Sequence, residues 1–242
     1  MQKYSVILFD LDGTLTDSAP GILNSVRYAC RKMQLPEPAP ETLRRFLGPP
    51  LLDSFRELLG LSPEESQQAV AAFREYFPTK GLFENEVYPG VEAMLRDLKA
   101  AGKTVVLATS KPEEYARRIM EHFALAQYFD AICGATLDER RTDKAEVIAY
   151  ALQTAHITDT AATVMVGDRE HDVKGAAKNG LPCIGALYGY GSREELSAAG
   201  AAAIADTVEM LHTILLYTKR PCTFNVQGRF FAIICNIIFS DR

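Results

Sequence analysis

The sequence predicts an α/β fold: a Rossmann-like parallel sheet with helices on both faces, and a small all-helical domain inserted after the first strand. Short apolar runs alternate with amphipathic stretches along most of the chain, which is typical of parallel strands joined by helices. Between residues 17 and 87 only helical patterns occur. With 242 residues, of which 48% are hydrophobic, the chain can bury one large core or two smaller ones.

Six apolar runs are expected to form the sheet, because each is short, β-branched or aliphatic, and bounded by polar or turn residues. They are YSVILF (4–9), TVVLAT (104–109), DAIC (130–133), ATVMVG (162–167), PCIGAL (182–187) and AAIA (202–205). The amphipathic segments between them are expected to be the helices that cover the sheet.

The insert is expected to be a folded helical unit. Its first helix is predicted over 18–34, and another begins at Ser62, where Pro63 suits the first helical position and Glu65 completes a capping box. After it, Pro89 is expected to open a helix of the main domain. The predicted domains are therefore a core at 1–16 and 88–217, a cap at 17–87, and a C-terminal extension at 218–242.

Charge and cysteine usage limit the partners. A formal net charge of −5 and an isoelectric point near 5.5 argue against a nucleic-acid-binding or anionic-membrane surface. The N-terminal apolar run is too short and too soon acidic for a signal peptide. The five cysteines are scattered and lack a C-x-x-C pair, which favours reduced thiols and a cytoplasmic location.

Two carboxylates, Asp10 and Asp12, stand where the first strand ends, in VILFDLDGTLTDS. Side chains two residues apart on an extended segment point to the same side, so both carboxylates are expected at the carboxyl edge of the sheet, where α/β folds bind ligands. Neighbouring carboxylates repel each other unless a divalent metal or a shared proton lies between them. Gly13 permits the sharp turn that follows.

Other strand ends bring complementary groups to this edge. Thr109 and Ser110 offer hydroxyls that can bind phosphate oxygens, and Asp168 and Asp172 in VMVGDREHD form a second acidic pair. Lys144 begins the helix before that strand and can reach the edge as a point charge. Oxygen ligands of this kind suit Mg²⁺ shared with a phosphate.

These residues resemble the motifs of the haloacid dehalogenase superfamily, in its phosphoglycolate-phosphatase-like branch with a helical C1-type cap. The first motif of the family stands here as DLDGTL and the fourth as GDREHD, and the resemblance covers about residues 4–217. Thr109 and Lys144 match the second and third motifs. Lys144 stands in TDKAE instead of the Lys-Pro common in the branch, and Arg140 and Arg141 are nearby alternatives.

The resemblance implies a hydrolase that forms an aspartyl-phosphate on Asp10, with Asp12 as general acid and then base. It implies Mg²⁺ held by Asp10, the backbone carbonyl of Asp12 and Asp168. Asp172 is expected to support the metal through water or Lys144.

The transferring group is expected to meet Thr109, Ser110, Lys144 and Gly13. The cap loop LRRFLGPPLLDSF (43–55) would read the leaving group, with Arg45 able to reach a carboxylate or second phosphate.

In the family, the dehalogenase and phosphonate-hydrolase branches carry residues other than Asp at the position of Asp12. The presence of Asp12 therefore argues against both branches. The leading prediction is a phosphatase for a small phosphate ester, phosphoglycolate-phosphatase-like or 5'-nucleotidase-like, acting as a monomer or homodimer. A β-phosphoglucomutase-like phosphomutase, a pyrophosphatase and a non-catalytic binding protein are the alternatives. Phosphoglycolate, nucleoside monophosphates and pyrophosphate stay open as substrates.

The C-terminal extension carries an apolar run at 230–239 that the resemblance does not account for. The run is too short to span a bilayer, which takes roughly 20 apolar residues. No predicted site residue lies in it. We expect truncation after Lys219 to change solubility or oligomeric state and to leave turnover within a few-fold of the full-length protein.

Overall fold

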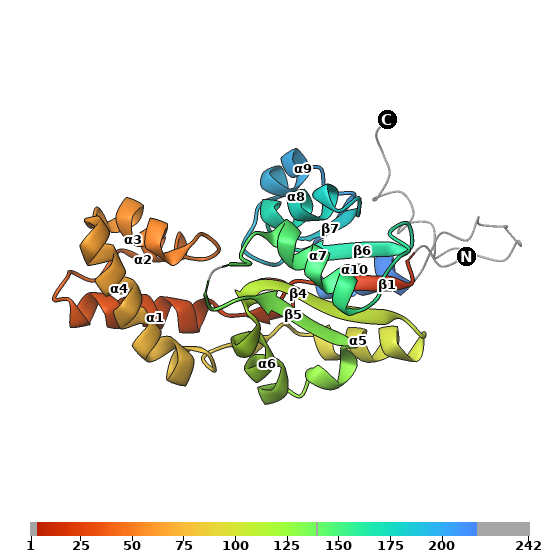
Figure 1. The fold of residues 1–242 in the computed structure, drawn as a ribbon, viewed down its shortest axis with the longest axis horizontal. Helices are drawn as coiled ribbons and strands as arrows, with labels where there is room; N and C mark the ends of the chain where they lie inside the picture. Colours follow the sequence, from red (N-terminus) through yellow and green to blue (C-terminus); the bar gives the residue numbers. More distant parts are fainter. Residues whose placement is uncertain (1–3, 139, 217–242) are drawn as a thin grey trace, which may run out of the picture.

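A computed structural model describes residues 4–138 and 140–216. The expectations for the extension at 218–242 lie outside the described residues. Figure 1 shows a sheet domain and, beside it, a body built of helices alone. Among the described residues, no helix is both long and apolar enough to cross a bilayer.

The predicted parallel sheet is confirmed. Its strand order is β5-β4-β1-β6-β7-β8, with every pairing parallel. The strands are β1 (Val6–Phe9), β4 (Thr104–Pro112), β5 (Ala131–Ala135), β6 (Thr163–Gly167), β7 (Cys183–Ala186) and β8 (Ala203–Ala205). Val6 of β1 lies opposite Thr104 on one side and Thr163 on the other. The end of β1 is therefore flanked by the ends of β4 and β6.

Helices cover both faces of the sheet (Figure 1). They are α5 (Val91–Ala100), α6 (Glu113–His122), α7 (Lys144–Thr154), α8 (Glu170–Lys178), α9 (Arg193–Ala199) and α10 (Val208–Leu216), with a short 3₁₀ turn η2 (Ala126–Tyr128). Alternation along β1 sends Ile7 and Phe9 into the cluster with α5, α6 and α10, and sends Leu8 into the cluster with α7, α8 and α9. Burial on both faces explains why the strands are almost wholly apolar.

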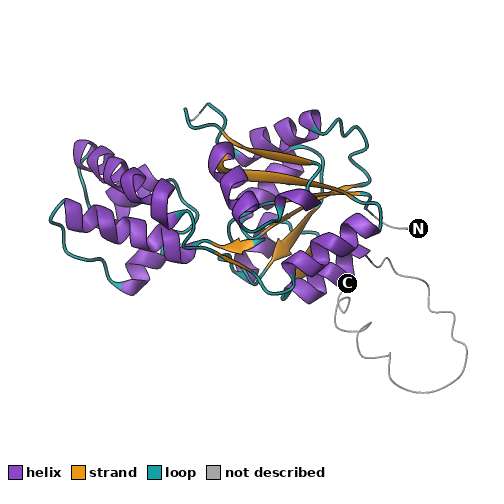
Figure 2. Cartoon of the chain, turned by 90° about the horizontal axis from the view of Figure 1, so that it is seen from below, coloured by secondary structure: helices purple, strands orange, loops and turns teal. Residues whose placement is uncertain are grey.

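The insert is helical, as predicted. It comprises α1 (Ala19–Lys32), α2 (Pro40–Arg44), α3 (Leu51–Leu59), α4 (Pro63–Tyr76) and a π-helical turn η1 (Phe77–Gly81). The capping box at Ser62 and Glu65 is present. Two strands, β2 (Thr16–Asp17) and β3 (Glu86–Val87), pair antiparallel where the chain enters and leaves the cap (Figure 2). We refer to the insert as the cap and to this two-stranded connection as its hinge.

Two local predictions need correction. Helix α5 begins at Val91 instead of Pro89, because Tyr88 to Val91 close a turn and Gly90 at φ +90° is the N-cap. Strand β4 continues beyond the predicted end at Thr109 as far as Pro112, through a register shift against β5. That irregularity carries Ser110 and Lys111 to the functional edge.

Candidate active site

Three buried carboxylates meet at the carboxyl edge of the sheet. Asp10 follows β1 and extends the ladder, since its amide donates to the Val166 carbonyl at 2.9 Å. Asp168 follows β6, and Asp172 lies in the first turn of α8. One oxygen from each of these carboxylates lies within 4.8 Å of the others. The strand ends thus place the two acidic pairs of the sequence at one point.

Lys144 is the cation that faces this cluster. Its Nζ lies 2.8 Å from an oxygen of Asp10 and 2.8 Å from an oxygen of Asp172, and it also contacts the Ala108 carbonyl at 3.3 Å. Asp143 is the N-cap of helix α7, so Lys144 is the first residue of this helix. Burial alone would lower the pKa of the Lys144 ammonium, but Asp10 and Asp172 raise it well above its ordinary value. Lys144 is therefore charged.

The cluster carries more negative charge than Lys144 can balance. Burial first, and then the Asp172 and Asp10 carboxylates, raise the pKa of Asp168 well above its usual range. Its Oδ1 is buried and accepts no hydrogen bond from the residues that the structure describes. A desolvated group of carboxylate oxygens with an unsatisfied acceptor fits a hard divalent cation, which reverses this repulsion when bound.

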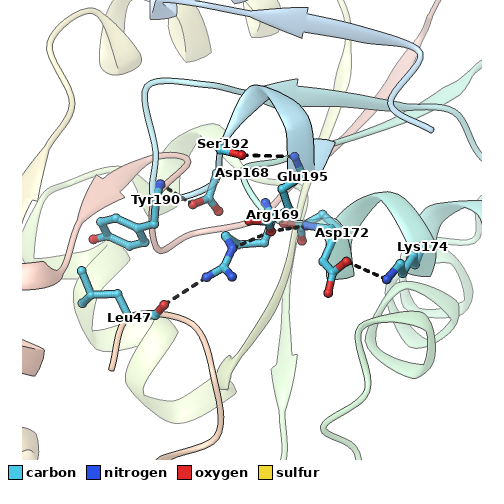
Figure 3. Close-up of polar contacts among 9 residues, drawn as sticks. Leu47, Asp168, Arg169, Asp172, Lys174, Tyr190, Ser192 and Glu195 are labelled. Carbon is cyan, nitrogen blue, oxygen red and sulfur yellow. Dashed lines mark hydrogen bonds and ion pairs between the residues drawn. The ribbon is translucent and has the colours of Figure 1, made fainter. Parts of the chain in front are cut away.

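Asp168 is held in place by a loop that sequence reasoning left without a role. The Tyr190 amide donates to Asp168 Oδ2 at 2.8 Å (Figure 3). On the other side, Gly13 adopts φ +77°, and a Cβ built there would lie 2.2 Å from the same oxygen. Only glycine leaves room for this carboxylate beside the first motif. Gly13 therefore shapes the site through its backbone.

The same loop reaches the root of the cap. The Tyr190 hydroxyl lies 2.9 Å from Asp17 Oδ1 and accepts from the Ala19 amide at 3.0 Å. The Tyr188 hydroxyl donates to the Thr14 carbonyl at 3.0 Å. The GYG segment of the sequence thus ties the Asp168 carboxylate to the hinge.

Asp12 has a different partner from Asp10. Its Oδ2 lies 3.0 Å from Lys111 Nζ, and this ammonium also sits 4.8 Å from the centre of the Phe77 ring in η1. Sequence reasoning missed Lys111. The available signal was its position two residues after Thr109, because alternate residues of an extended segment share a side.

The remaining predicted residues are divided between the buried site and its exposed margin. Thr109 is buried, and its hydroxyl oxygen accepts from the Lys111 amide at 3.2 Å. Ser110 is exposed beside it on β4. Arg45 is exposed at the C-cap of α2, on the cap. The structure therefore gathers Asp10, Asp168, Asp172 and Lys144 tightly, and it leaves Ser110 and Arg45 outside that buried cluster.

The chain is similar to known hydrolases in sequence. The family model for haloacid dehalogenase-like hydrolases matches residues 7–186. A 5'-nucleotidase of Pseudomonas aeruginosa is 44% identical over 81% of this chain and 88% of its own, and a tyrosine-protein kinase PtkA of Mycobacterium bovis is 37% identical over 87% and 72%. More distant relatives include phosphoglycolate phosphatases.

Solved structures agree with this placement. The crystal structure of a predicted phosphatase from Clostridium acetobutylicum is 48% identical to this chain. It has a TM-score of 0.80 over 87% of this chain and 97% of its own. A match of this length is longer than the sheet domain alone, so it also takes in inserted helices.

Proposed function

Since the chain belongs to the haloacid dehalogenase-like hydrolases, we propose that it is a Mg²⁺-dependent phosphatase that hydrolyses a small phosphate monoester through an aspartyl-phosphate on Asp10. The observation that carries the proposal is the buried group of Asp10, Asp168 and Asp172 with Lys144 beside it. This arrangement provides a nucleophile, a metal site and a fixed cation at one edge of the sheet.

The three carboxylates, with the backbone carbonyl of Asp12, would hold Mg²⁺. When bound, the ion supplies charge neutralisation to the oxygens of the transferring phosphoryl group. Lys144 orients the Asp10 carboxylate through the 2.8 Å contact with Oδ1. The attack is therefore assigned to the other carboxylate oxygen of Asp10.

The reaction proceeds in two steps. Asp10 attacks phosphorus in line, the bond from phosphorus to the ester oxygen breaks, and Asp12 donates a proton to the departing alcohol. Asp12 then removes a proton from water, whose oxygen attacks the phosphorus of the aspartyl-phosphate. Inorganic phosphate leaves and the Asp10 carboxylate is regenerated. Asp12 needs access to solvent and substrate for this exchange, and 24% of its side chain is exposed.

Cations and hydroxyls surround the position proposed for the phosphoryl group. Lys144 and Lys111 are both buried cations on this edge. Thr109 stands on β4, the strand between β1 and β5. We assign Thr109, Lys144 and the Ser110 backbone region to the phosphoryl oxygens, and Lys111 to the Asp12 carboxylate.

The 44% identical 5'-nucleotidase makes nucleoside 5'-monophosphates the first substrates to assay, followed by phosphoglycolate. A β-phosphoglucomutase-like phosphomutase and a pyrophosphatase are the alternatives. Release of inorganic phosphate from a panel of esters, sugar phosphates and pyrophosphate, with Mg²⁺ or with chelator, distinguishes these reactions.

The test of the nucleophile is acid-quench trapping. The protein is mixed with p-nitrophenyl phosphate and Mg²⁺, quenched in acid and digested. A phosphoryl group is then sought by mass spectrometry on the peptide that contains Asp10. Asp10→Asn should abolish both the label and turnover, whereas Asp97→Asn, at a half-exposed carboxylate on α5, should preserve both. Turnover within a few-fold of wild type in Asp10→Asn would refute the assignment.

A further inference from the structure

The side chain of Arg169 leaves the carboxylate cluster and extends toward the cap (Figure 3). Arg169 stands directly after Asp168, and its amide donates to Asp172 Oδ2 at 3.1 Å. Its guanidinium Nη1 donates to the Leu47 carbonyl, in the turn between α2 and α3, at 3.0 Å. The chemistry proposed above makes no use of this guanidinium. Arg169 thus contacts the Asp172 carboxylate through its backbone amide and the α2–α3 turn of the cap through its side chain.

The guanidinium of Arg169 is held in place by a carboxylate of the core domain. Glu195, in the first turn of α9, lies 2.7 Å from Arg169 Nε and also accepts from the Glu170 amide at 2.9 Å. Ser192 caps the same helix through the Glu195 amide. Only 23% of each partner's side chain is exposed, so the ion pair is partly shielded from water. The arginine is therefore held in the orientation that the cap contact requires.

The cap side is shaped to receive it. Gly48 follows the acceptor residue Leu47 and adopts φ +107°, and a Cβ built there would lie 2.2 Å from Arg169 Nη1. Glycine satisfies both the left-handed backbone and the close approach of the guanidinium. The Leu47 amide donates to the Arg44 carbonyl and closes the last turn after α2, while the Leu47 carbonyl accepts the bond from the core.

The contact joins the cap to the core at a point away from η1, where Lys111 and Tyr115 of the core also meet the Phe77 ring. On the opposite side of the cap, Arg118 of α6 donates to the Pro78 carbonyl of η1 at 2.7 Å, close to where the cap returns to the core. The Leu47 contact lies at the distant α2–α3 turn, seen in Figure 1 as the orange loop that approaches the core. Rotation of the cap about its hinge would break the Leu47 contact. A bond made only in the closed arrangement contributes its full free energy to closure.

We propose that Arg169 is a positioning residue that holds the α2–α3 turn against the core when the cap is closed. Glu195 orients the guanidinium for this contact. We call the contact between Arg169 and Leu47 the latch. The inference rests on the proposed function only for its kinetic consequence, since the contact itself is structural. Substrate that engages the cap is retained while the latch is formed. The variant Arg169→Met keeps an unbranched apolar stem and removes the donors.

Kinetics with p-nitrophenyl phosphate and Mg²⁺ provide one readout. Arg169→Met should raise KM about tenfold, the effect of losing one charge-assisted hydrogen bond, with kcat within about threefold. Arg169→Lys should resemble it, because an ammonium cannot engage Glu195 and Leu47 together as the guanidinium fork does. The matched control is Lys174→Met, which removes another cation of α8 whose ion pair with Glu170 is exposed. It should stay within about twofold of wild type.

Glu195 supplies a sharper test because it touches neither substrate nor cap. Glu195→Gln should raise KM by a few-fold. The double variant with Arg169→Met should be no worse than Arg169→Met alone, since the two residues act through one contact. Additive effects of the two substitutions would overturn the proposed coupling.

Two measurements on the full-length protein are independent of turnover. Hydrogen exchange at the Leu47 and Gly48 amides should accelerate about tenfold in Arg169→Met, and small-angle scattering should show a larger radius of gyration. Faster exchange with an unchanged radius would mean a local tether instead of a cap latch and would refute the proposal. If wild type shows no phosphatase activity but both physical changes occur, the proposed function fails and the latch stands.

Discussion

Asp168→Asn should stabilise the metal-free protein while removing its activity. The side chain of Asp168 is buried, with its Oδ2 accepting from the Tyr190 amide and its Oδ1 unsatisfied by the described residues. An amide of the same shape retains an oxygen for Tyr190. It also turns the other position into a donor toward the Asp10 and Asp172 oxygens.

The magnitude follows from the spacing of the carboxylates. At the 4.8 Å limit of the cluster, two unit charges interact by about 3.5 kcal/mol at an effective dielectric constant near 20. Asp168 faces the Asp10 and Asp172 carboxylates, and Lys144 partly neutralises these two through its contacts with both, so we take about one such repulsion as uncompensated. After relaxation and partial hydration, we expect a gain of about 1–3 kcal/mol. That gain raises the apparent Tm by about 3–10 °C for a chain of this size.

The assay is thermal unfolding followed by circular dichroism, in chelator and in Mg²⁺. In chelator the variant should melt above wild type, and Mg²⁺ should raise the Tm of wild type far more than that of the variant. Asp97→Asn serves as the control and should change the free energy of unfolding by less than about 0.5 kcal/mol. A variant that melts at or below wild type in chelator would refute the electrostatic account of the cluster.

The pH dependence provides a second check. Burial and the neighbouring carboxylates raise the pKa of Asp168 in the folded state above its unfolded value. Such a group favours the fold fully below the unfolded pKa, and this contribution is lost as pH rises through the folded pKa. The Tm advantage of Asp168→Asn in chelator should therefore be small in acid and should grow as pH rises. A constant difference across this range would contradict the sign of the shift.

Three further predictions concern the chemistry. Asp12→Asn should slow both formation and hydrolysis of the aspartyl-phosphate. With p-nitrophenyl phosphate, whose leaving group needs little acid assistance, the slow hydrolysis should appear as accumulated phosphoenzyme. Unaffected rates for both steps would give Asp12 another role. Lys111→Met should lower kcat about tenfold for poor leaving groups, because Asp12 loses its 3.0 Å partner, and an unchanged kcat would argue against this assignment. Ca²⁺ should inhibit the Mg²⁺-supported reaction, since its longer and more numerous ligand contacts displace Asp10 from the in-line position, and full activity in excess chelator would remove the metal from the mechanism.

Local sequence patterns were sufficient for the elements of the fold. Apolar runs with turn residues at their ends identified the six sheet strands, and the capping box at Ser62 identified a helix start in the cap. Local backbone preference misplaced the start of α5, because the turn at Gly90 took precedence over the helix-opening tendency of Pro89. The extent of β4 was also underestimated, because its last residues pair through a register shift.

The candidate site could be predicted only where a motif stands at a strand end. Asp10 and Asp168 were predictable because parallel strands deliver their carboxyl ends to one edge, whatever the rest of the chain does. Thr109 and Lys144 depended on the family resemblance, since a lone hydroxyl or lysine at a helix start is common in any sequence. The roles of these residues in turnover are still predictions.

The sequence by itself determined the layered α/β architecture, the helical insert and the acidic edge, because hydrophobic periodicity and strand-end motifs are local properties. Only the tertiary structure decided which groups meet across long separations: Lys111 with Asp12, Tyr190 with both Asp168 and the hinge, and Arg169 with Leu47. These contacts depend on strand order, on a bulge and on the angle of the cap, none of which is encoded in the spacing of neighbouring residues. The physical reason is that packing of distant elements sets side-chain distances, whereas the local pattern sets only which face or edge a residue occupies.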